Sequence, residues 1–421
     1  MSSDLESSPE IQDIRRRVED FLTEFIYPNE KALSRGGDEA WSVEQSLEQA
    51  EAWNLMQSIQ QKAKERGLWA LGLPKEIGGG GLGFMPYVFV NEIVGRSEYA
   101  IVGLGTHSAQ DATMLNLYGS PEQKKRWLLP LVNGDVYPCY SMTEPEVSGA
   151  DPTGLRTRAV QDGDEWVING HKWFTSGANR ASFATVMTVT DPDAPPYERF
   201  SMIVVPTDTP GFEIVRVVPV MGEISGGHCE VRYNDVRVPL TNLLGPRGQA
   251  FKIAQKRLGP GRIYHCMRWL GQAQRAFELM CERAISRHAF GGPLADKQTI
   301  QNWIADSAAE IQAARLLTLD AARKIDRGDE ARVEISLIKF WGAKVLHDVI
   351  DRAIQVHGAL GVSGDTPLER MYRHARFARI YDGPDEVHRM VVSRRILREF
   401  KEGRKFDFAR GVASRKFKQE L

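Results

Sequence analysis

Hydrophobic and polar positions divide this chain into regions of different periodicity. The first region, residues 8 to about 136, has the pattern of helices joined by loops. Ser120 followed by Pro121 is a helix-start pattern, because serine caps a helix well and proline suits the first helical position. It predicts a helix through Leu131, and we assign residues 1–138 to an α-helical N-terminal domain.

The second region alternates short runs of β-branched and aromatic residues with turn residues. Asp162-Gly163 and Asn169-Gly170 predict two hairpin turns in quick succession. Further strand candidates follow at residues 184–190, 201–205 and 212–218. We therefore expect an antiparallel sheet or barrel in a central domain over residues 139–245.

The third region, after Pro246, is helical again. Apolar or small residues at spacings of three and four indicate one buried helix face, made of Ile335, Ile338, Gly342, Val345 and Val349. Long helices with short connections predict a four-helix bundle over residues 246–400, followed by a basic tail over residues 401–421. The fold class is α+β multidomain.

Composition narrows the classes of function. The 421 residues are 42% hydrophobic with a formal net charge of −1, which suits a globular protein and gives no electrostatic case for a nucleic-acid partner. The four cysteines are scattered, which indicates a reducing compartment. The N-terminus lacks a signal-peptide core, and no apolar run reaches transmembrane length. We expect a cytoplasmic protein.

Several common motifs are absent or weak. Residues 78–83 fit the G-x-G-x-x-G spacing, but a preceding strand and a following acid are missing, so a flexible loop is the better interpretation. The nine histidines form no two-histidine metal motif, and we expect no metal. Residues 140–145 could hydrogen-bond a polar heteroaromatic ring, or could be an ordinary strand entering a turn.

The segment from Ala378 to His388 raises a similar choice. It places Asp382, Asp385 and Glu386 within five residues. Each of these acids could be a catalytic base or a first-turn carboxylate of a helix that begins near Asp385. The last two suit the helix start better, because they follow Pro384.

Motifs in order along the chain resemble the acyl-CoA dehydrogenase family. They lie at residues 119–124, 142–145, 169–175, 236–239, 286–291, 355–361 and 381–383. Within that family, residues 226–228, 257–268 and 382–388 are most similar to the branch of family members ten and eleven. We expect no counterpart of the kinase-like N-terminal region of those relatives.

The resemblance implies a helical domain, a central β-barrel and a C-terminal four-helix bundle. It implies an FAD enzyme that oxidises the Cα–Cβ bond of an acyl-CoA to trans-2-enoyl-CoA in fatty-acid β-oxidation. Electron-transfer flavoprotein is the implied acceptor, and a homodimer or homotetramer is the implied assembly.

The same resemblance assigns roles to residues. Asp382 stands where the family usually has a glutamate base, and Gly383 lets the thioester approach closely. Gly261, at the alternative base position, has no side chain to offer. The implied substrate contacts are Ser148, Arg262 and Gly383. The place of the family's CoA-contacting serine could instead fall at Ala150, and Arg262 could instead be a salt-bridged helix arginine. The implied FAD contacts are Tyr140, Ser141, Met142, Thr143, Trp173, Phe174, Thr175, Arg287, Phe290, Gln298, Gln355, Val356, His357, Gly358, Ala359, Pro384, Asp385 and Glu386.

An aspartate base keeps alternatives open. Nitroalkane oxidase-like members of the same fold also use aspartate there, so an oxidase of that kind, an acyl-CoA oxidase or a flavin monooxygenase are competing hypotheses. A non-catalytic helical scaffold is a further hypothesis. Bound flavin and reduction by acyl-CoA would separate these hypotheses.

Overall fold

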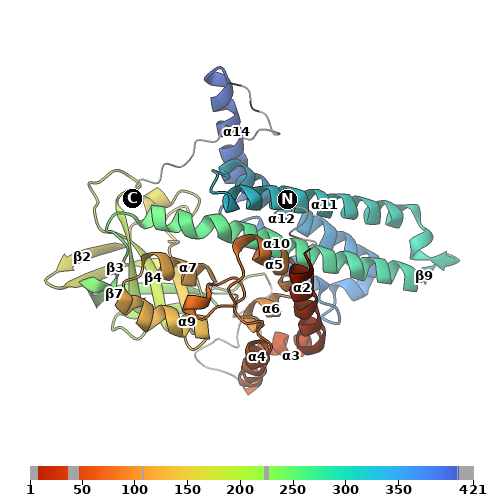
Figure 1. The fold of residues 1–421 in the computed structure, drawn as a ribbon, viewed down its shortest axis with the longest axis horizontal. Helices are drawn as coiled ribbons and strands as arrows, with labels where there is room; N and C mark the ends of the chain where they lie inside the picture. The colour runs from red at the N-terminus through yellow and green to blue at the C-terminus, as the bar shows by residue number, and fades with distance from the viewer. Residues whose placement is uncertain (1–7, 37–46, 107–108, 222–226, 405, 407–421) are drawn as a thin grey trace. The chain divides into compact units, whose positions relative to one another are not determined.

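The computed structural model describes residues 8–36, 47–106, 109–221, 227–404 and 406 (Figure 1). The chain forms two compact units, and each is built from separated segments. The helical unit contains Met1–Leu22, Gly83–Ala100 and Gly259–Leu421, and the sheet unit contains Thr23–Leu82 and Ile101–Leu258. Among the residues described, no helix is both long and apolar enough to cross a membrane.

The helical unit is built around long helices. They are α2 (Pro9–Phe21), α5 (Phe84–Val94), α10 (Ala250–Ser286, in this unit from Gly259), α11 (Gln298–Asp326), α12 (Arg332–His357), α13 (Leu368–Ala378) and α14 (Asp385–Lys401). Helix α12 contacts α11, α13 and α14, and α5 contacts α2 and α11. A short hairpin of β9 (His288–Ala289) and β10 (Gly292–Pro293) follows α10.

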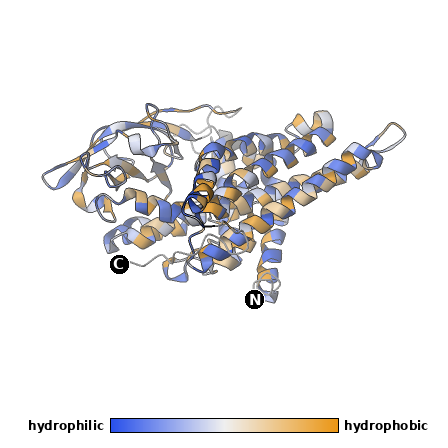
Figure 2. Ribbon diagram, turned by 90° about the horizontal axis from the view of Figure 1, so that it is seen from above, coloured by the Kyte–Doolittle hydropathy of each residue, from blue (hydrophilic) through white to orange (hydrophobic). Residues whose placement is uncertain are grey.

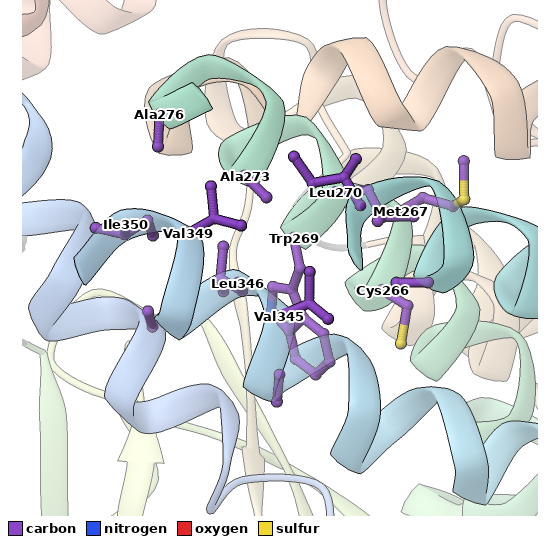
Figure 3. Close-up of a cluster of buried hydrophobic side chains, with 14 of the residues drawn as sticks. Cys266, Met267, Trp269, Leu270, Ala273, Ala276, Val345, Leu346, Val349 and Ile350 are labelled. Atoms are coloured by element: carbon purple, nitrogen blue, oxygen red, sulfur yellow. The ribbon is translucent and has the colours of Figure 1, made fainter. Parts of the chain in front are cut away.

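Hydrophobic and hydrophilic residues alternate along these helices (Figure 2), and the apolar ones form a shared core (Figure 3). Ile338, Val345 and Val349 of α12 are buried, as the spacing along the sequence predicts. From α10, Trp269 and Leu270 pack into the same cluster. This core fixes α10 and α12, the two helices that carry most of the candidate site.

Two glycines allow α10 to pass very close to α5. A Cβ atom on Gly271 would lie 2.0 Å from the carbonyl oxygen of Glu92, and one on Gly95 would lie 2.2 Å from the Cα of Arg268. These distances are too short for any side chain. Glycine is therefore required at both positions. The close packing fixes the position of α10 relative to α5.

The sheet unit contains shorter helices. They are α3 (Glu30–Gly36), α4 (Leu47–Glu65), α6 (Glu98–Gly103, shared with the helical unit), α7 (Ala109–Tyr118), α8 (Pro121–Gln123) and α9 (Leu129–Asn133). The predicted helix start at Ser120 is confirmed, because its side chain and that of Gln123 form a reciprocal capping box. Helical turns continue to Asn133, and Gly134 ends them with a φ of 83°.

The sheet of this unit is mixed and open. Its strands are β1 (Pro138–Ser141), β2 (Arg158–Asp162), β3 (Glu165–Ser176), β4 (Phe183–Val189), β5 (Phe200–Pro206), β6 (Phe212–Val217), β7 (His228–Pro239) and β8 (Leu243–Leu244). They pair in the order β6-β7-β3-β2-β4-β5-β8, with β1 on β4. The pairs β1–β4 and β2–β4 are parallel, so the sheet is not purely antiparallel, and the strands described do not close a barrel.

One of the two predicted hairpin turns is wrong. Asp162-Gly163 does join β2 to β3, but β3 runs straight through Asn169 and Gly170. The pairing with β7 only shifts register between Ile168 and Gly170, which is a bulge. A Cβ atom on Gly170 would lie 2.3 Å from Thr157 Oγ1, so this glycine serves a close approach and not a turn.

The glycine run at residues 78–83 is a loop, as predicted, but backbone hydrogen bonds tie it down. The amide of Gly79 donates to Pro74 O, that of Gly80 to Ala70 O and that of Gly81 to Leu73 O, at 2.8–3.0 Å. A Cβ atom on Gly79 would lie 2.3 Å from Leu73 O. The glycines therefore permit tight backbone packing.

Candidate active site

Asp382 lies in the loop between α13 and α14 with a left-handed backbone. Its φ is 54°, and the φ of the following Gly383 is 103°. A left-handed conformation costs free energy for a residue with a Cβ atom, so the surroundings must hold it. Such residues concentrate at functional sites, which singles out Asp382 among the acids of this segment.

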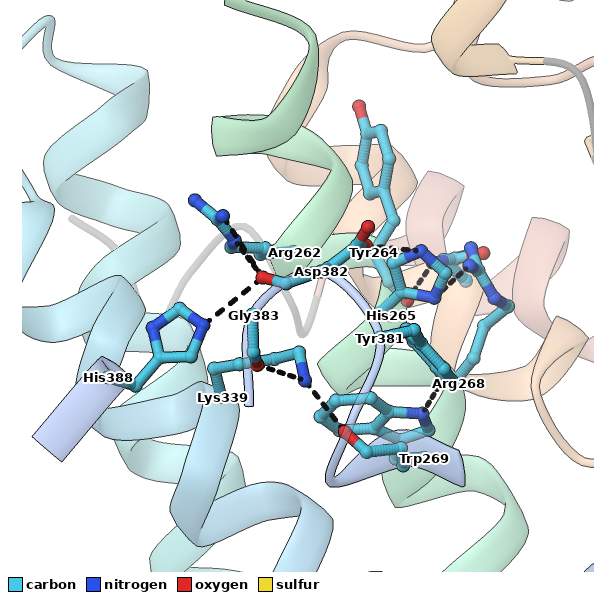
Figure 4. A network of polar contacts seen from close by, with 12 residues as sticks. Arg262, Tyr264, His265, Arg268, Trp269, Lys339, Tyr381, Asp382, Gly383 and His388 are labelled. Atoms are coloured by element: carbon cyan, nitrogen blue, oxygen red, sulfur yellow. Dashed lines mark hydrogen bonds and ion pairs between the residues drawn. The ribbon is translucent and has the colours of Figure 1, made fainter. Parts of the chain in front are cut away.

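Basic side chains from three helices hold the backbone of this loop (Figure 4). Arg262 of α10 donates from Nε and Nη2 to the carbonyl oxygen of Asp382, at 3.3 and 3.1 Å. His388 of α14 donates from Nε2 to the same oxygen at 3.2 Å. Lys339 of α12 donates to Gly383 O at 3.4 Å and to Ala378 O at 2.7 Å. These contacts offset the backbone strain at Asp382.

The carboxylate of Asp382 faces His265 of α10. His265 Nε2 lies 3.3 Å from Asp382 Oδ2, and each of the two side chains is 23% exposed. Arg268 Nη2 lies 2.9 Å from the other ring nitrogen of His265. Trp269 donates to the hydroxyl of Tyr381 at 3.0 Å, and this pair forms the aromatic wall beside the histidine ring. The carboxylate thus sits in a partly enclosed polar site.

Burial shifts the protonation equilibria around this carboxylate. Burial lowers the pKa of Lys339 to about 8, although Asp382 attracts the proton. Burial, helped by the charge of Arg262, lowers the pKa of His388 to about 4. Burial also raises the pKa of the Cys266 thiol to about 12. His388 and Cys266 are therefore neutral near pH 7, while Arg262 supplies fixed positive charge.

The two later acids of the segment belong to the start of α14, as predicted. Asp385 is the first residue of the helix and is 2% exposed. Its carboxylate lies 2.8 Å from Arg379 Nε and 3.6 Å from Arg389 Nη1. Glu386 is exposed in the same first turn. The predicted contacts of Pro384, Asp385 and Glu386 with FAD stay predictions.

In the sheet unit, the two predicted flavin segments lie side by side. The amide of Trp173 donates to Thr143 O at 3.0 Å. The side chains of Ser141 and Thr175 are fully buried, 3.2 Å apart, and Ser141 also accepts from the hydroxyl of Tyr233 at 2.9 Å. Both residues are 0% exposed as a whole, and their predicted contacts with FAD stay predictions.

A bulge presents the aromatic part of this segment. The pairing of β3 with β7 skips Trp173 and Phe174, and Phe174 has a φ of 48°. Phe174 is 42% exposed, with its ring centroid 5.0 Å from that of Trp173. Bulges commonly re-aim side chains beside active sites. Exposed aromatic surface next to backbone groups outside the β3–β7 ladder fits a flat, polar-edged ring such as isoalloxazine.

A buried ion pair, which the sequence did not reveal, joins these segments. Glu144 accepts from Lys172 Nζ at 2.9 Å and from the amides of Arg156 and Thr157 at 2.6 and 2.8 Å. Lys172 also donates to Met142 O at 2.7 Å. Burial lowers the pKa of Lys172 to about 8, against the pull of Glu144. The Thr-Glu-Pro and Lys-Trp-Phe-Thr runs were the available sequence signal for this Glu144–Lys172 ion pair, which joins the two predicted flavin segments.

The other predicted FAD contacts lie in the helical unit, on α11, at the end of α12 and around the β9–β10 hairpin. Phe290 in that hairpin is 98% exposed with a φ of 50°. Arg287, Gln298, Gln355, Gly358 and Ala359 are exposed as well. Val356 and His357 are buried, and His357 Nδ1 contacts Ala353 O at 2.8 Å, so their side chains face the core.

Two of the three predicted acyl-CoA contacts, Ser148 and Arg262, differ in accessibility. Ser148 is exposed in the loop after Glu144. Arg262, by contrast, turns its guanidinium onto the Asp382 loop. Burial lowers the pKa of Arg262. The structure therefore brings Arg262 to Asp382 and keeps it beside the same loop as Gly383.

Comparison with known proteins identifies the class. Models of the acyl-CoA dehydrogenase N-terminal, middle and C-terminal domains match residues 8–135, 139–236 and 248–397 in order. Together they cover most of the chain. The chain belongs to the acyl-CoA dehydrogenase family of flavin-dependent oxidoreductases, which confirms the predicted fold class and enzyme class.

Individual relatives define the branch. Probable acyl-CoA dehydrogenase FadE2 of Mycobacterium tuberculosis is 44% identical over 94% of this chain and 97% of its own length. Acyl-CoA dehydrogenase family member 11 of Rattus norvegicus is 39% identical over 92% of this chain, which spans 50% of that relative. Family member 10 of Mus musculus is 41% identical over 93% of this chain and 37% of its own length. The predicted relation to members ten and eleven is confirmed.

Solved structures agree with this assignment. A structure from Mycobacterium abscessus, assigned as an acyl-CoA dehydrogenase, superimposes with a TM-score of 0.86 at 38% identity. The match covers 93% of this chain and 99% of that one. The architecture of helical, β and helical domains is thus shared over nearly the whole chain.

Proposed function

We propose that this protein is an FAD-dependent acyl-CoA dehydrogenase that uses Asp382 as its base to form trans-2-enoyl-CoA. The observation that carries the proposal is the geometry of Asp382, a carboxylate that is 23% exposed on a strained loop held by basic side chains. By the resemblance of residues 381–383 to the family motif, that loop would carry the base. A carboxylate fixed in a partly enclosed site meets the requirement for abstracting a weakly acidic α proton.

Asp382 would take the α proton of the thioester, and the substrate would retain the electron pair of the broken C–H bond. Aspartate is one methylene shorter than glutamate, so the loop backbone must carry the carboxylate toward the substrate. Its left-handed φ and the clamped carbonyl support this role. Gly383 adds no side chain at the point where the thioester must approach.

The flavin segments of the sheet unit support the cofactor assignment. Met142 and Thr143 are half-buried beside Trp173, and Phe174 is exposed next to them. Through backbone groups and these side chains, residues 140–143 and 173–175 would hold the ring. Bound FAD would accept the β hydrogen as a hydride. Glu144 and Lys172 would keep both segments in register.

Residues around the β9–β10 hairpin support an oligomer. Phe290 is 98% exposed with a φ of 50°, so burial of its own ring does not offset the cost of this backbone conformation within the described chain. We propose that Arg287, Phe290 and Gln298 reach the FAD of a neighbouring subunit in a homodimer or homotetramer. Gln355 to Ala359 would offer backbone amides to the same cofactor. Its electrons would pass to electron-transfer flavoprotein, and the reaction would belong to fatty-acid β-oxidation in the cytoplasm.

The contacts of Arg262 support a positioning role for that residue. Its guanidinium donates twice to the Asp382 carbonyl, so a contact with the CoA chain would require this side chain to move. Ser148, which is exposed, needs no such movement to meet the substrate. We therefore propose Ser148 as the more accessible of the two predicted CoA contacts.

An acyl-CoA panel with an artificial electron acceptor tests the proposed activity. We expect reduction of the acceptor with at least one straight-chain thioester between butyryl-CoA and docosanoyl-CoA, and slow turnover with oxygen alone. Fast oxygen turnover with acyl-CoA would instead assign an acyl-CoA oxidase. Turnover of nitroethane without acyl-CoA activity would assign the nitroalkane oxidase-like alternative, which the aspartate base keeps open.

A further inference from the structure

The proton on His265 can be placed from its neighbours. Arg268 Nη2 lies 2.9 Å from His265 Nδ1, and a guanidinium can only donate hydrogen bonds. Nδ1 must therefore accept, so in the neutral ring the hydrogen lies on Nε2. Nε2 is the atom that faces Asp382 Oδ2, at 3.3 Å, which is long for a hydrogen bond but in reach of one.

The ring has little room to leave this orientation. The centroid of His265 lies 5.3 Å from that of Tyr381 and 6.2 Å from that of Trp269, and these two residues are themselves hydrogen-bonded (Figure 4). Arg268 is buried among the same groups, and burial lowers its pKa. The aromatic wall and the arginine thus fix both the plane of the imidazole and its tautomer.

We infer that His265 is a positioning residue for the proposed base, donating from Nε2 to the Asp382 carboxylate and staying neutral throughout turnover. The inference rests on the proposed function of Asp382. In the reaction step, the substrate Cα–H bond breaks and an O–H bond forms on Asp382. The electron pair stays with the substrate, and His265 gains and loses no proton, because Arg268 occupies Nδ1.

The short side chain of an aspartate base makes a hydrogen-bond donor to its carboxylate necessary. The backbone at Asp382 is already set by its φ of 54° and by the donors to its carbonyl oxygen. The remaining freedom is rotation of the side chain about its two torsions. A donor at Oδ2 removes that freedom, and a displacement of about 1 Å can cost on the order of 100-fold in rate.

Other titratable groups also face Asp382 and must stay unchanged in the test. They are Arg262, Cys266 and Arg268 of α10, Lys339 of α12, His388 of α14 and Tyr381 of the loop itself. Asp385 of α14 acts on Lys339 of this set. Because variants at position 265 leave this set intact, an altered pH profile reports on the imidazole contact.

The test compares His265→Phe and His265→Gln in the FAD-bound enzyme with the best acyl-CoA of the panel. The phenyl ring keeps the packing and removes the donor, while the glutamine amide restores an N–H near the position of Nε2. For His265→Phe we expect kcat to fall about 100-fold with little change in KM. The acidic limb of kcat/KM should move to higher pH, because the ionised base has lost a donor. His265→Gln should restore most of the lost kcat and return the acidic limb of kcat/KM most of the way to its wild-type position.

His347→Phe is the matched control, because it makes the same replacement of an imidazole by a phenyl ring on α12. His347 packs against Tyr372, outside the polar network around Asp382. This variant should leave kcat and the pH profile unchanged. The inference is overturned if His265→Phe turns over like the wild type, or if His265→Gln is as impaired as His265→Phe. Should His265→Phe fail to fold with FAD, His265→Asn, which is too short to reach Oδ2, must show the same loss.

Asp382→Asn separates this inference from the proposed function. If Asp382→Asn retains turnover, the base itself is misassigned. If Asp382→Asn is inactive while His265→Phe is unaffected, the base stands and only the role of His265 fails.

Discussion

At the scale of single residues, the site combines one strained carboxylate with buried basic groups. His388 is 4% exposed and contacts the Asp382 carbonyl, so the loop depends on a neutral histidine. Burial holds the pKa of His388 at about 4, below its usual 6.5. Acid must therefore weaken this part of the fold, because protonation favours the unfolded chain.

We predict that the free energy of unfolding falls as the pH drops from 6.5 toward 4. Above pH 6.5 the contribution of His388 is fully present, and it is lost as the pH passes its folded pKa of about 4. The maximum loss is about 3 kcal/mol. Urea unfolding should show a shallower acid dependence for His388→Gln, which keeps an N–H donor but does not titrate. Equal pH slopes for both proteins would exclude His388 as the cause.

Residue-level prediction succeeded where the information was local. The helix start after Pro384 follows from neighbouring residues in the sequence. The partners of Asp382 do not, because Arg262 lies 120 residues away and reaches it only when α10 has packed. The contact of Arg262 with the CoA chain stays a prediction, because no local pattern shows where a long side chain turns.

At the scale of elements, the close contact of α5 with α10 governs where the site residues of α10 stand. Gly95 and Gly271 face backbone atoms of the partner helix at distances that exclude any Cβ. The helix that they position carries Arg262, His265 and Arg268. Small residues at this contact therefore have a consequence for the active site as well as for packing.

We predict that Gly271→Ala destabilises the protein by about 3 kcal/mol, because its methyl group would meet the Glu92 carbonyl at 2.0 Å. Gly342→Ala on α12 is the control, since the nearest atom to its Cβ position is Trp269 Cε3 at 3.5 Å, an ordinary van der Waals contact. At that position, the higher helix propensity of alanine should stabilise the protein by up to about 1 kcal/mol. Thermal unfolding of the two variants checks the pair, and similar shifts in both would contradict the packing argument.

Prediction of elements from the sequence failed where a tertiary contact overrides a local signal. Asp162-Gly163 forms its hairpin, whereas Asn169-Gly170 stays in β3. There Asn169 pairs with Asp235 of β7, and Thr157 packs against Gly170. Two similar dipeptides thus form a turn in one place and a bulge in the other. The difference is the pairing of the second dipeptide with β7, a strand that lies far along the chain.

At the scale of the whole molecule, the order of helical, β and helical regions was predictable from periodicity, and the family models confirm it. The open, mixed path of the sheet was not predictable, because β1 and β2 pair with β4 in parallel across long connections. The interleaving of the two units was not predictable either. Residues 83–100 join the C-terminal part of the chain through contacts that local patterns do not encode.

The most direct test of the central claim is anaerobic bleaching of the bound flavin by acyl-CoA, measured for the wild type and for Asp382→Asn. We predict rapid loss of the oxidised flavin absorbance in the wild type. Asp382→Asn should retain its flavin, with an unchanged oxidised spectrum, and show at least about 1,000-fold slower bleaching, because the variant cannot accept the α proton. Bleaching of Asp382→Asn at the wild-type rate would contradict the account.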